Sequence, residues 1–264
     1  MPSRRYAKKK SRSKSRVRFS TKRTYRARKS RSRVAKTVRS VLRSQSETKY
    51  AWLTYPVTNF NSSADSTGDI MQIIPSIVQG LDQAARIGDQ ILVKSICIRG
   101  NVNIVPSVAD NTRCRLAVRM VVVQPKMFGR WDDISANTEG WLSMVTRVGS
   151  GTAVLSGVAP YINAPLATDM VHVYYDKLFY LSTFYTSAGA GIATGDVSKA
   201  SRMFKFYVKS KGKKLKYQTG SQGYNASFNP VMLLAYQHLD GSTSDTLTTA
   251  VSLQYYVDMR YSDM

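Results

Sequence analysis

The sequence is poor in the residues that metal and disulfide chemistry require. Its 264 residues include two cysteines and two histidines, and Cys97, Cys114, His172 and His238 contain no closely spaced pair. A zinc site needs such a pair, and a disulfide-stapled secreted scaffold needs many more cysteines. We therefore expect two free thiols in a reducing compartment, and neither a bound metal nor a cofactor.

Long hydrophobic runs are also missing. The longest unbroken apolar run, residues 231–236, is far shorter than the roughly 18 residues that span a bilayer. The first thirty residues hold only scattered apolar side chains, so they lack the core of a secretory signal. Residues 1–33 also lack the helical period of a mitochondrial transit peptide. The sequence therefore predicts neither membrane insertion nor export by these routes.

Catalytic signatures are absent in the same way. The chain contains no phosphate-binding G-x-x-x-x-G-K-[ST] loop and no G-x-S-x-G nucleophile elbow. Gly189, Gly191 and Gly195 miss the dinucleotide-binding spacing by one residue. Both histidines lie in strand-like patterns, where a structural role is the simpler interpretation, and the adjacent acids Asp132 and Asp133 are typical of an exposed turn. We predict that the protein is not an enzyme.

Acidic residues are missing from the start of the chain. Residues 1–43 carry nineteen of the thirty-nine lysines and arginines, and the first carboxylate is Glu47. The formal net charge is +23, but the rest of the chain balances twenty bases against sixteen acids. The sequence therefore predicts a basic arm, residues 1–46, and a nearly neutral body, residues 47–264. Because the arm has few apolar side chains to offset the entropy of ordering, we expect it to be disordered without a polyanion.

The arm is the first candidate nucleic-acid-binding site. Its cations can each meet a phosphate and release counterions without reading base sequence. Arginine outnumbers lysine twelve to seven, and Tyr6, Phe19 and Tyr25 offer aromatic faces to unpaired bases, which favours single strands. A nuclear-localisation signal alone would need only about five to eight basic residues. The candidate residues are Arg4, Arg5, Lys8, Lys9, Lys10, Arg12, Lys14, Arg16, Arg18, Lys22, Arg23, Arg26, Arg28, Lys29, Arg31, Arg33, Lys36, Arg39 and Arg43.

A second basic cluster lies between Lys199 and Lys216, where eight bases are interleaved with aromatic residues. On a strand, this spacing places several of the bases on one face. The candidates for a second nucleic-acid contact are Lys209, Lys211, Lys213, Lys214 and Lys216. The alternative is a solvated strand and turn whose aromatic residues pack into a core.

From residue 47 onward, β-branched and aromatic residues alternate with polar ones, a pattern typical of strands. The predicted strands cover residues 48–60, 90–105, 113–124, 170–175, 177–185, 203–209, 230–238 and 251–261. Each strand is expected to bury one side. The predicted buried residues include Leu92, Ile96, Ile98, Val102 and Ile104, and Leu116, Val118, Met120 and Val122. Weaker helical patterns occur at 34–42, 75–85 and 131–148, and residues 187–196 are a Gly- and Ala-rich loop.

Eight strands without β–α–β alternation, and without an internal repeat, predict an all-β fold with antiparallel sheets. Among such folds, the eight-stranded jelly roll fits the strand count. We therefore expect a single jelly-roll domain preceded by a disordered basic arm.

Three segments resemble those of a known family. Residues 74–102, IPSIVQGLDQAARIGDQILVKSICIRGNV, are similar to the I-x-Q-G … R-x-G-x-x-I-x-[IVL]-K-x-I segment of capsid proteins from circular Rep-encoding single-stranded DNA viruses and satellite necrosis viruses. The matching residues are Gln79, Gly80, Arg86, Gly88 and Lys94. Residues 171–184 resemble the V-x-[YLH]-D-K-x-F-x-L hairpin of these capsids, with Asp176 and Lys177 at its turn. The stretch K-G-K-K-L-K-Y followed by N-P-V-M-L-L-A-Y resembles their late strands.

The resemblance implies a jelly roll that self-assembles into an icosahedral T=1 shell of about 60 copies, with its arms on a single-stranded viral genome. It also implies a place in the virion and in the host nucleus, reached through the nuclear import machinery. An arginine-rich arm containing tyrosine is more like the DNA viruses, so single-stranded DNA is favoured. The alternatives are a satellite RNA virus coat protein, a cellular nucleic-acid-binding module with a basic tail, and an enzyme with a basic targeting arm.

Self-assembly is also expected from apolar residues in the predicted connections. Trp131, Trp141 and Tyr161 fall between strands, where a monomer would leave them in large exposed patches. Contacts between copies would cover such patches, so we expect these three side chains at the surface of the isolated chain.

Overall fold

The computed structural model describes residues 34–38, 47–82, 84–105, 114–157, 161–183, 199–210, 212–218, 223–239 and 251–263. The chain divides into two units, Met1–Glu47 and Thr48–Met264. In the first unit, residues 34–38 form a turn of α-helix with exposed side chains, in agreement with part of the helix predicted over 34–42. The predicted disorder of residues 1–33 and the predicted loop at 187–196 lie outside the described residues.

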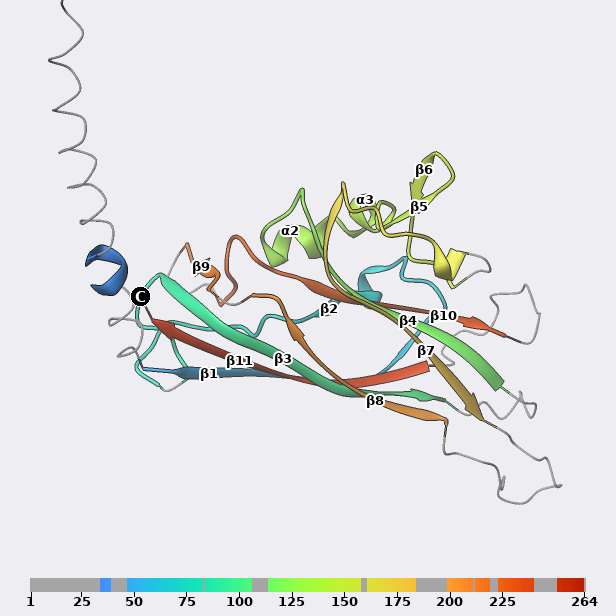
Figure 1. Cartoon of the computed structure of the whole chain (residues 1–264), viewed down its shortest axis with the longest axis horizontal. Coiled ribbons are helices and arrows are strands. Elements are labelled where there is room, and N and C mark those ends of the chain that lie inside the picture. Colours follow the sequence, from blue (N-terminus) through green and yellow to red (C-terminus); the bar gives the residue numbers. More distant parts are fainter. Residues whose placement is uncertain are drawn as a thin grey trace, which may run out of the picture. The chain divides into compact units, whose positions relative to one another are not determined.

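Strands make up most of the second unit (Figure 1). They are β1 (Lys49–Phe60), β2 (Met71–Gln72), β3 (Gln90–Ile104), β4 (Cys114–Pro125), β5 (Thr146–Val148), β6 (Gly151–Ala153), β7 (Val171–Thr183), β8 (Ser201–Val208), β9 (Lys214–Lys216), β10 (Val231–His238) and β11 (Val251–Asp263). The helices are α2 (Trp131–Ala136) and α3 (Thr138–Leu142), with 3₁₀ turns η1 (Thr67–Asp69) and η2 (Tyr161–Asn163). Where residues 75–85 are described, they form no helix, contrary to the weak pattern there. None of the helices seen in the described parts of the chain is long and apolar enough to cross a membrane.

Two antiparallel sheets are arranged in jelly-roll order. The first sheet runs β1-β11-β3-β8, with β9 also paired to β3, and the second runs β2-β10-β4-β7. Along the chain, β1 to β4 alternate between the two sheets, and after β7 the strands β8, β10 and β11 alternate again. This is the strand order of a jelly roll, so the predicted all-β fold with antiparallel sheets is confirmed. The strand count is not the predicted one, because β2, β9 and the β5-β6 hairpin were not foreseen and the strands predicted over 170–175 and 177–185 form the single strand β7.

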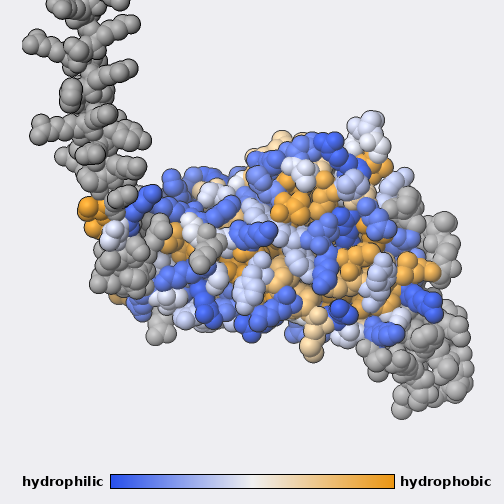
Figure 2. Space-filling view, in the orientation of Figure 1, coloured by the Kyte–Doolittle hydropathy of each residue, from blue (hydrophilic) through white to orange (hydrophobic). Residues whose placement is uncertain are grey.

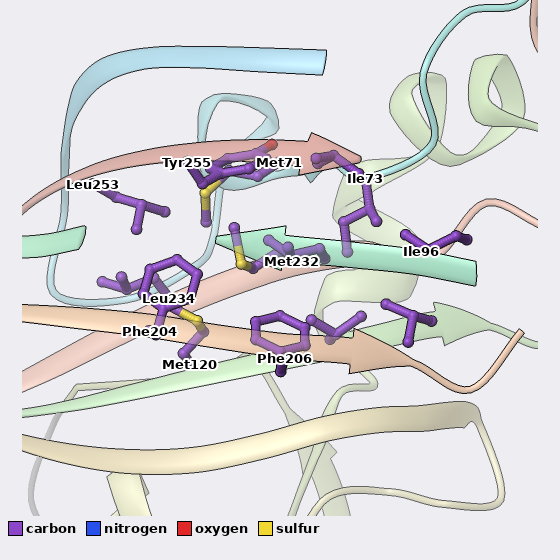
Figure 3. Packing of buried hydrophobic residues seen from close by; sticks show 14 of the residues in the cluster. Met71, Ile73, Ile96, Met120, Phe204, Phe206, Met232, Leu234, Leu253 and Tyr255 are labelled. Carbon is purple, nitrogen blue, oxygen red and sulfur yellow. The ribbon is translucent and has the colours of Figure 1, made fainter. Parts of the chain in front are cut away.

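A hydrophobic core fills the space between the two sheets (Figure 3). In Figure 3, Met120, Met232 and Leu234 of the second sheet lie close to Phe204 and Phe206 of the first. The alternation of β8 shows how the sequence produces this arrangement, since Phe204, Phe206 and Val208 are buried while the residues between them are exposed. With the exception of Leu92, the residues predicted to be buried in β3 and β4 all belong to this core.

A β-bulge in β3 places Leu92, which is buried as predicted, on the other side of the strand from Ile96, contrary to the face predicted for both. A register shift after Arg260 of β11 leaves Lys94 as an extra residue in β3. A bulge exchanges the two sides of a strand on either side of the extra residue. Before Lys94, therefore, Ile91 and Val93, rather than Leu92, join the core between the sheets. The bulge therefore decides which side chains in the first part of β3 face the core between the sheets.

The second sheet is buried on both sides, so the expectation of one buried side per strand is wrong for β4 and β10. The helices α2 and α3 lie over the side of this sheet that faces away from the first sheet (Figure 1). There, Val121 and Val123 of β4 and Leu233 of β10 form a second cluster with Ile134 and Trp141. A strand that is covered on both faces reads as a continuous apolar run. This accounts for the unbroken apolar segment in β10.

The second cluster also corrects the expectation that three aromatic residues lie at the surface. Trp141 is 1% exposed, and its Nε1 donates a hydrogen bond to the Ile134 carbonyl oxygen at 2.9 Å. Trp131 is partly buried and packs against the same cluster. Tyr161, at 40% exposure, is the one of the three that agrees with the expectation. The connection between β4 and β7 therefore folds back on its own sheet instead of leaving its tryptophans exposed.

The predicted hairpin with Asp176 and Lys177 at its turn is wrong, because both residues lie inside the continuous strand β7. Tyr174 is an extra residue in β7 that has no partner position in β4. This bulge interrupts the alternation of inward and outward residues, and in the sequence the interruption looks like the end of one strand and the start of another. Arg119 of β4 donates to Asp176 from Nε at 2.9 Å and from Nη2 at 2.8 Å. Its Nη1 also donates to the carbonyl oxygen of Ile162, at 2.8 Å, in η2. Asp176 therefore holds Arg119, which fixes the connection to the sheet, and the Asp-Lys pair does not reverse the chain.

Arg86, which carries much of the resemblance before β3, has a structural role. Its guanidinium is fully buried and lies 4.3 Å from the centre of the Tyr217 ring. Arg86 Nη1 donates to the Gly88 carbonyl oxygen at 2.7 Å, and the Arg86 carbonyl accepts from the Gly80 amide at 3.0 Å. In the same loop, Gln79 Nε2 donates a hydrogen bond to the carbonyl oxygen of Ile87 at 2.8 Å. The motif therefore holds the loop that delivers the chain into β3.

Gly100 is required by the packing of the first sheet, and replacing it tests the fold. A Cβ at this position would lie 2.3 Å from the Gln254 carbonyl oxygen and 2.8 Å from both Phe204 and Tyr255. Gly100→Ala is therefore expected to lower the free energy of unfolding by about 1–3 kcal/mol, measured by urea denaturation. Gly140→Ala, in α3 with nothing within 4 Å of its Cβ position, is the control and should not destabilise. Equal unfolding midpoints for wild type and Gly100→Ala would contradict this packing.

Candidate nucleic-acid interface

The structure describes five of the predicted nucleic-acid-binding residues: Lys36, Lys209, Lys213, Lys214 and Lys216. Lys36 is exposed on the helical turn of the first unit. The other predicted residues of the arm, and Lys211, lie outside the described residues. Of the two candidate sites, the second basic cluster is therefore the one that the described residues largely cover.

The second basic cluster forms one edge of the first sheet. β8 pairs with β3 over Ile96–Asn103, and β9 pairs with β3 over Gln90–Leu92, so the two strands follow one another along the same edge. The turn between them contains Gly212, whose φ of 81° lies in the left-handed region that favours glycine. The amide of Gly212 donates to the Val93 carbonyl oxygen at 2.9 Å, which ties the turn to β3. Lys214 and Lys216 are thus carried on a hydrogen-bonded strand, and Lys213 on a turn that is bonded to β3.

The strand alternation of β9 separates lysines that are adjacent in the sequence. Leu215 and Tyr217 are buried in the core between the sheets, so Lys214 and Lys216 point to the opposite, outer side and are exposed. Lys209 is exposed too, two residues after the outward Tyr207 of β8. These three lysines therefore lie on the same side of the first sheet.

Lys213 points the other way and has different surroundings. Its Nζ lies 4.1 Å from the centre of the Phe228 ring and 5.7 Å from that of Tyr174. Partial burial lowers the pKa of the Lys213 ammonium, and burial raises the pKa of the Tyr174 hydroxyl beside it. The aromatic faces offset part of the cost of removing this ammonium from water. The predicted group of lysines is therefore divided into an outward set and one lysine that packs on aromatic rings.

Two further cations on the outer side of the first sheet were missed in the sequence. Arg99 of β3 pairs directly with Lys205 of β8, and Arg260 of β11 pairs with Ser95 of β3. Their side chains are 54% and 51% exposed, respectively. Alternation in the sequence shows that each points to one side of its strand, but the order of the strands is needed to place them beside the lysines.

Comparisons with known proteins give likenesses to solved structures but none to sequences. No protein-family model and no curated protein matches the sequence of the chain. The full particle of Israeli acute paralysis virus, heated to 63 degrees, matches with 11% identity and a TM-score of 0.34, over 80% of this chain and 68% of that chain. A crystallised pentamer of the same virus matches with 12% identity and a TM-score of 0.32, over 81% of this chain and 68% of that chain. The jelly-roll assignment rests on the strand order described above.

The division of the lysines can be tested by alanine substitution. Lys213→Ala removes both the side-chain stem and the ammonium that lie over Phe228 and Tyr174, so it is expected to lower the free energy of unfolding by about 1 kcal/mol. Lys214→Ala and Lys216→Ala, at exposed positions, are expected to change it by less than about 0.5 kcal/mol. Urea denaturation of the three variants checks this, and equal effects at all three positions would contradict the different surroundings.

Proposed function

We propose that this chain is a viral capsid protein that assembles into an icosahedral shell and packages single-stranded DNA through its basic arm. The observation that carries the proposal is the combination of a jelly roll with an acid-free segment that holds nineteen cations. Jelly rolls also occur in lectins and cupins, but those functions require a ligand site and not a polycationic tail. The virion and the host nucleus are the places where such a protein acts.

The charges support packaging by the arm. Nineteen cations on one segment can neutralise phosphates without reading sequence, as a shell that must hold a whole genome requires. In a shell of about 60 copies, such arms supply on the order of a thousand positive charges, which matches on the order of a thousand nucleotides of single strand. A cellular module with a basic tail is expected to have a basic body as well, whereas here the excess charge is concentrated in the arm and one strand cluster.

Exposed apolar residues on the loop before β3 support self-assembly. Leu81 is 97% exposed, Ile87 59% and Val78 53%. The amide of Arg86 donates to the Val78 carbonyl oxygen at 3.1 Å, so the two halves of this loop lie side by side. On the face seen in Figure 2, hydrophilic and hydrophobic residues are interspersed. A contact between copies that covers this loop would remove its apolar side chains from water.

Assembly is the first test of the proposed function. The purified full chain at micromolar concentration and moderate salt is expected to form closed particles that elute in the megadalton range and are visible by negative-stain microscopy. Leu81→Glu should lower the particle yield while leaving the urea midpoint unchanged, because this side chain makes little contact within one copy. A wild-type chain that remains monomeric or dimeric would refute the shell.

Packaging by the arm is the second test. A chain lacking residues 1–43 is compared with the full chain by titrating one labelled, sequence-scrambled single strand at several salt concentrations. The slope of log affinity against log salt is about −0.7 for each neutralised phosphate, so loss of even a few contacts is measurable. The truncated chain is expected to keep its circular dichroism spectrum and to lose most of its affinity and salt dependence. Equal affinities and slopes would show that the arm is only a localisation signal.

A further inference from the structure

The outward side of the first sheet carries aromatic and cationic side chains in register. One row across β1, β11, β3 and β8 contains Trp52, Asp258, Cys97 and Tyr207, each directly paired with the next. Trp52 and Tyr207, at the two ends of this row, are both 60% exposed. Cys97 is buried and forms no disulfide. The row therefore presents two aromatic rings to solvent on the same face, near opposite edges of the sheet.

The next row alternates with the first. It contains Thr54, Tyr256, Arg99 and Lys205 on the same four strands. Tyr256 is 41% exposed, and it lies diagonally adjacent to Trp52. Strands are about 4.8 Å apart and side chains on one face repeat about every 6.8 Å along a strand, so these two rings are close neighbours. The aromatic and basic groups are thus interleaved across the sheet and not segregated.

Cations dominate the charge of this face. The outward basic side chains are Arg99, Lys205, Lys209, Lys214, Lys216 and Arg260. Among the outward residues of the described strands of this sheet, Asp258 is the one carboxylate. It lies 3.8 Å from Arg99 Nη2 and 3.8 Å from Arg260 Nε, which is too far for a strong bond to either. A single acid therefore leaves a clear positive excess.

Several of the cations are already placed beside aromatic rings. The guanidinium carbon of Arg260 lies 5.4 Å from the centre of the Tyr50 ring, and Tyr50 is 47% exposed. Lys205 Nζ lies 5.8 Å from the centre of the Tyr207 ring. Rigid strands hold these groups, so a ligand that uses both a ring and a neighbouring cation pays little entropy to order them. An unpaired nucleotide is such a ligand, since its base stacks on a ring and its phosphate pairs with a cation.

We propose that the outer face of the first sheet, formed by Trp52, Tyr256 and Tyr207 with Arg99, Lys205 and Arg260, is a second binding surface for single-stranded nucleic acid. It binds unpaired nucleotides by stacking and by phosphate contacts, without base-edge recognition. The chemical class of the ligand rests on the packaging function proposed above. The surface deepens that function, because it adds a fixed, base-stacking platform to an arm that recognises only charge.

The charge of the surface is tested with the full chain and a labelled single strand of thirty thymidines. Arg99→Gln, Lys205→Gln and Arg260→Gln are combined in one variant, and the affinity is measured at several salt concentrations. Loss of three phosphate contacts makes the slope of log affinity against log salt shallower by about 2. The matched control combines Arg115→Gln, Lys126→Gln and Lys177→Gln, three exposed cations of the second sheet and its connection. The control is expected to leave the slope unchanged.

The aromatic residues are tested separately, because stacking releases no counterions. Trp52→Ala and Tyr256→Ala together are expected to lower the affinity for the single strand by about tenfold or more, with the salt slope preserved. Affinity for a duplex of the same length should be unchanged, because its bases are already stacked on one another. A loss of both ligands to the same degree would overturn the stacking role.

Asp258→Asn is expected to raise the affinity for the single strand, whereas the other variants of this face lower it. Removing the one carboxylate of the face removes a negative charge that repels phosphate, so the variant should bind the single strand more tightly than wild type. A merely damaged fold would not produce this gain, and matched urea midpoints confirm that each variant is folded.

The proposal is overturned if the charge variant keeps the wild-type slope, or if the control variant lowers it equally. It is also overturned if the variants abolish particles while nucleic-acid binding is unchanged, because the face would then be a contact between copies. Particle formation is scored independently by microscopy. A chain that binds as proposed but never forms shells would refute the capsid function alone, and shells with unaltered binding would refute this surface alone.

Discussion

The pairing of β3 with β11 is the constraint on which the arrangement of the molecule depends. Every residue of β11 is paired with β3, and the other edge of β3 carries both β8 and β9. A shift of one residue in this pairing would exchange the core and solvent sides of the strand. The register is set by apolar side chains such as Ile96, Ile98 and Val102, whose burial is lost in any other register. The core and the outward rows of aromatic and basic groups are therefore consequences of one pairing.

The two sheets have different outer sides, and this difference divides the work of the domain. The second sheet is covered by α2, α3 and the connection that Arg119 and Asp176 fix in place. The first sheet has no such cover over its outer side among the described residues, and there the strands present cations and rings to solvent. Under the proposed function, this division leaves the outer side of the first sheet for the polyanion.

The basic arm and the first sheet are suited to different parts of nucleic-acid binding. A chain segment with nineteen cations and no acid adapts to any arrangement of phosphates. Side chains on paired strands are held at fixed spacings, which suits the stacking of bases. Lys213 shows that the two roles are not interchangeable, since this exposed lysine, one position from Lys214, lies over the Phe228 ring and not on the outer side of the sheet. Position in the sheet, more than residue type, decides what each cation can do.

Most of the strands, and the division into arm and body, follow from local patterns in the sequence. Alternating apolar residues predict β1, β3, β8 and β11, and runs of apolar residues predict β4 and β10, since each pattern depends on one strand alone. The absence of acidic residues before Glu47 separates the arm from the body. This feature is also local, because the net charge of a segment does not depend on contacts with other segments. Where a bulge or a second covering layer enters, local patterns fail. Lys94 and Tyr174 interrupt the alternation of β3 and β7, and the placement of each bulge depends on the strand opposite.

The burial of Trp141 and the charged face of the first sheet were decided by tertiary structure alone. Trp141 lies in a connection, and its burial depends on the outer side of β4, which no nearby residue specifies. Arg99, Arg260 and Trp52 are far apart in the sequence and meet only because β1, β11 and β3 are neighbours. Sequence determines which side of its own strand a residue occupies, because alternation has a fixed period of two. It does not determine which strands lie beside one another, because that choice is made by long-range packing of the whole core.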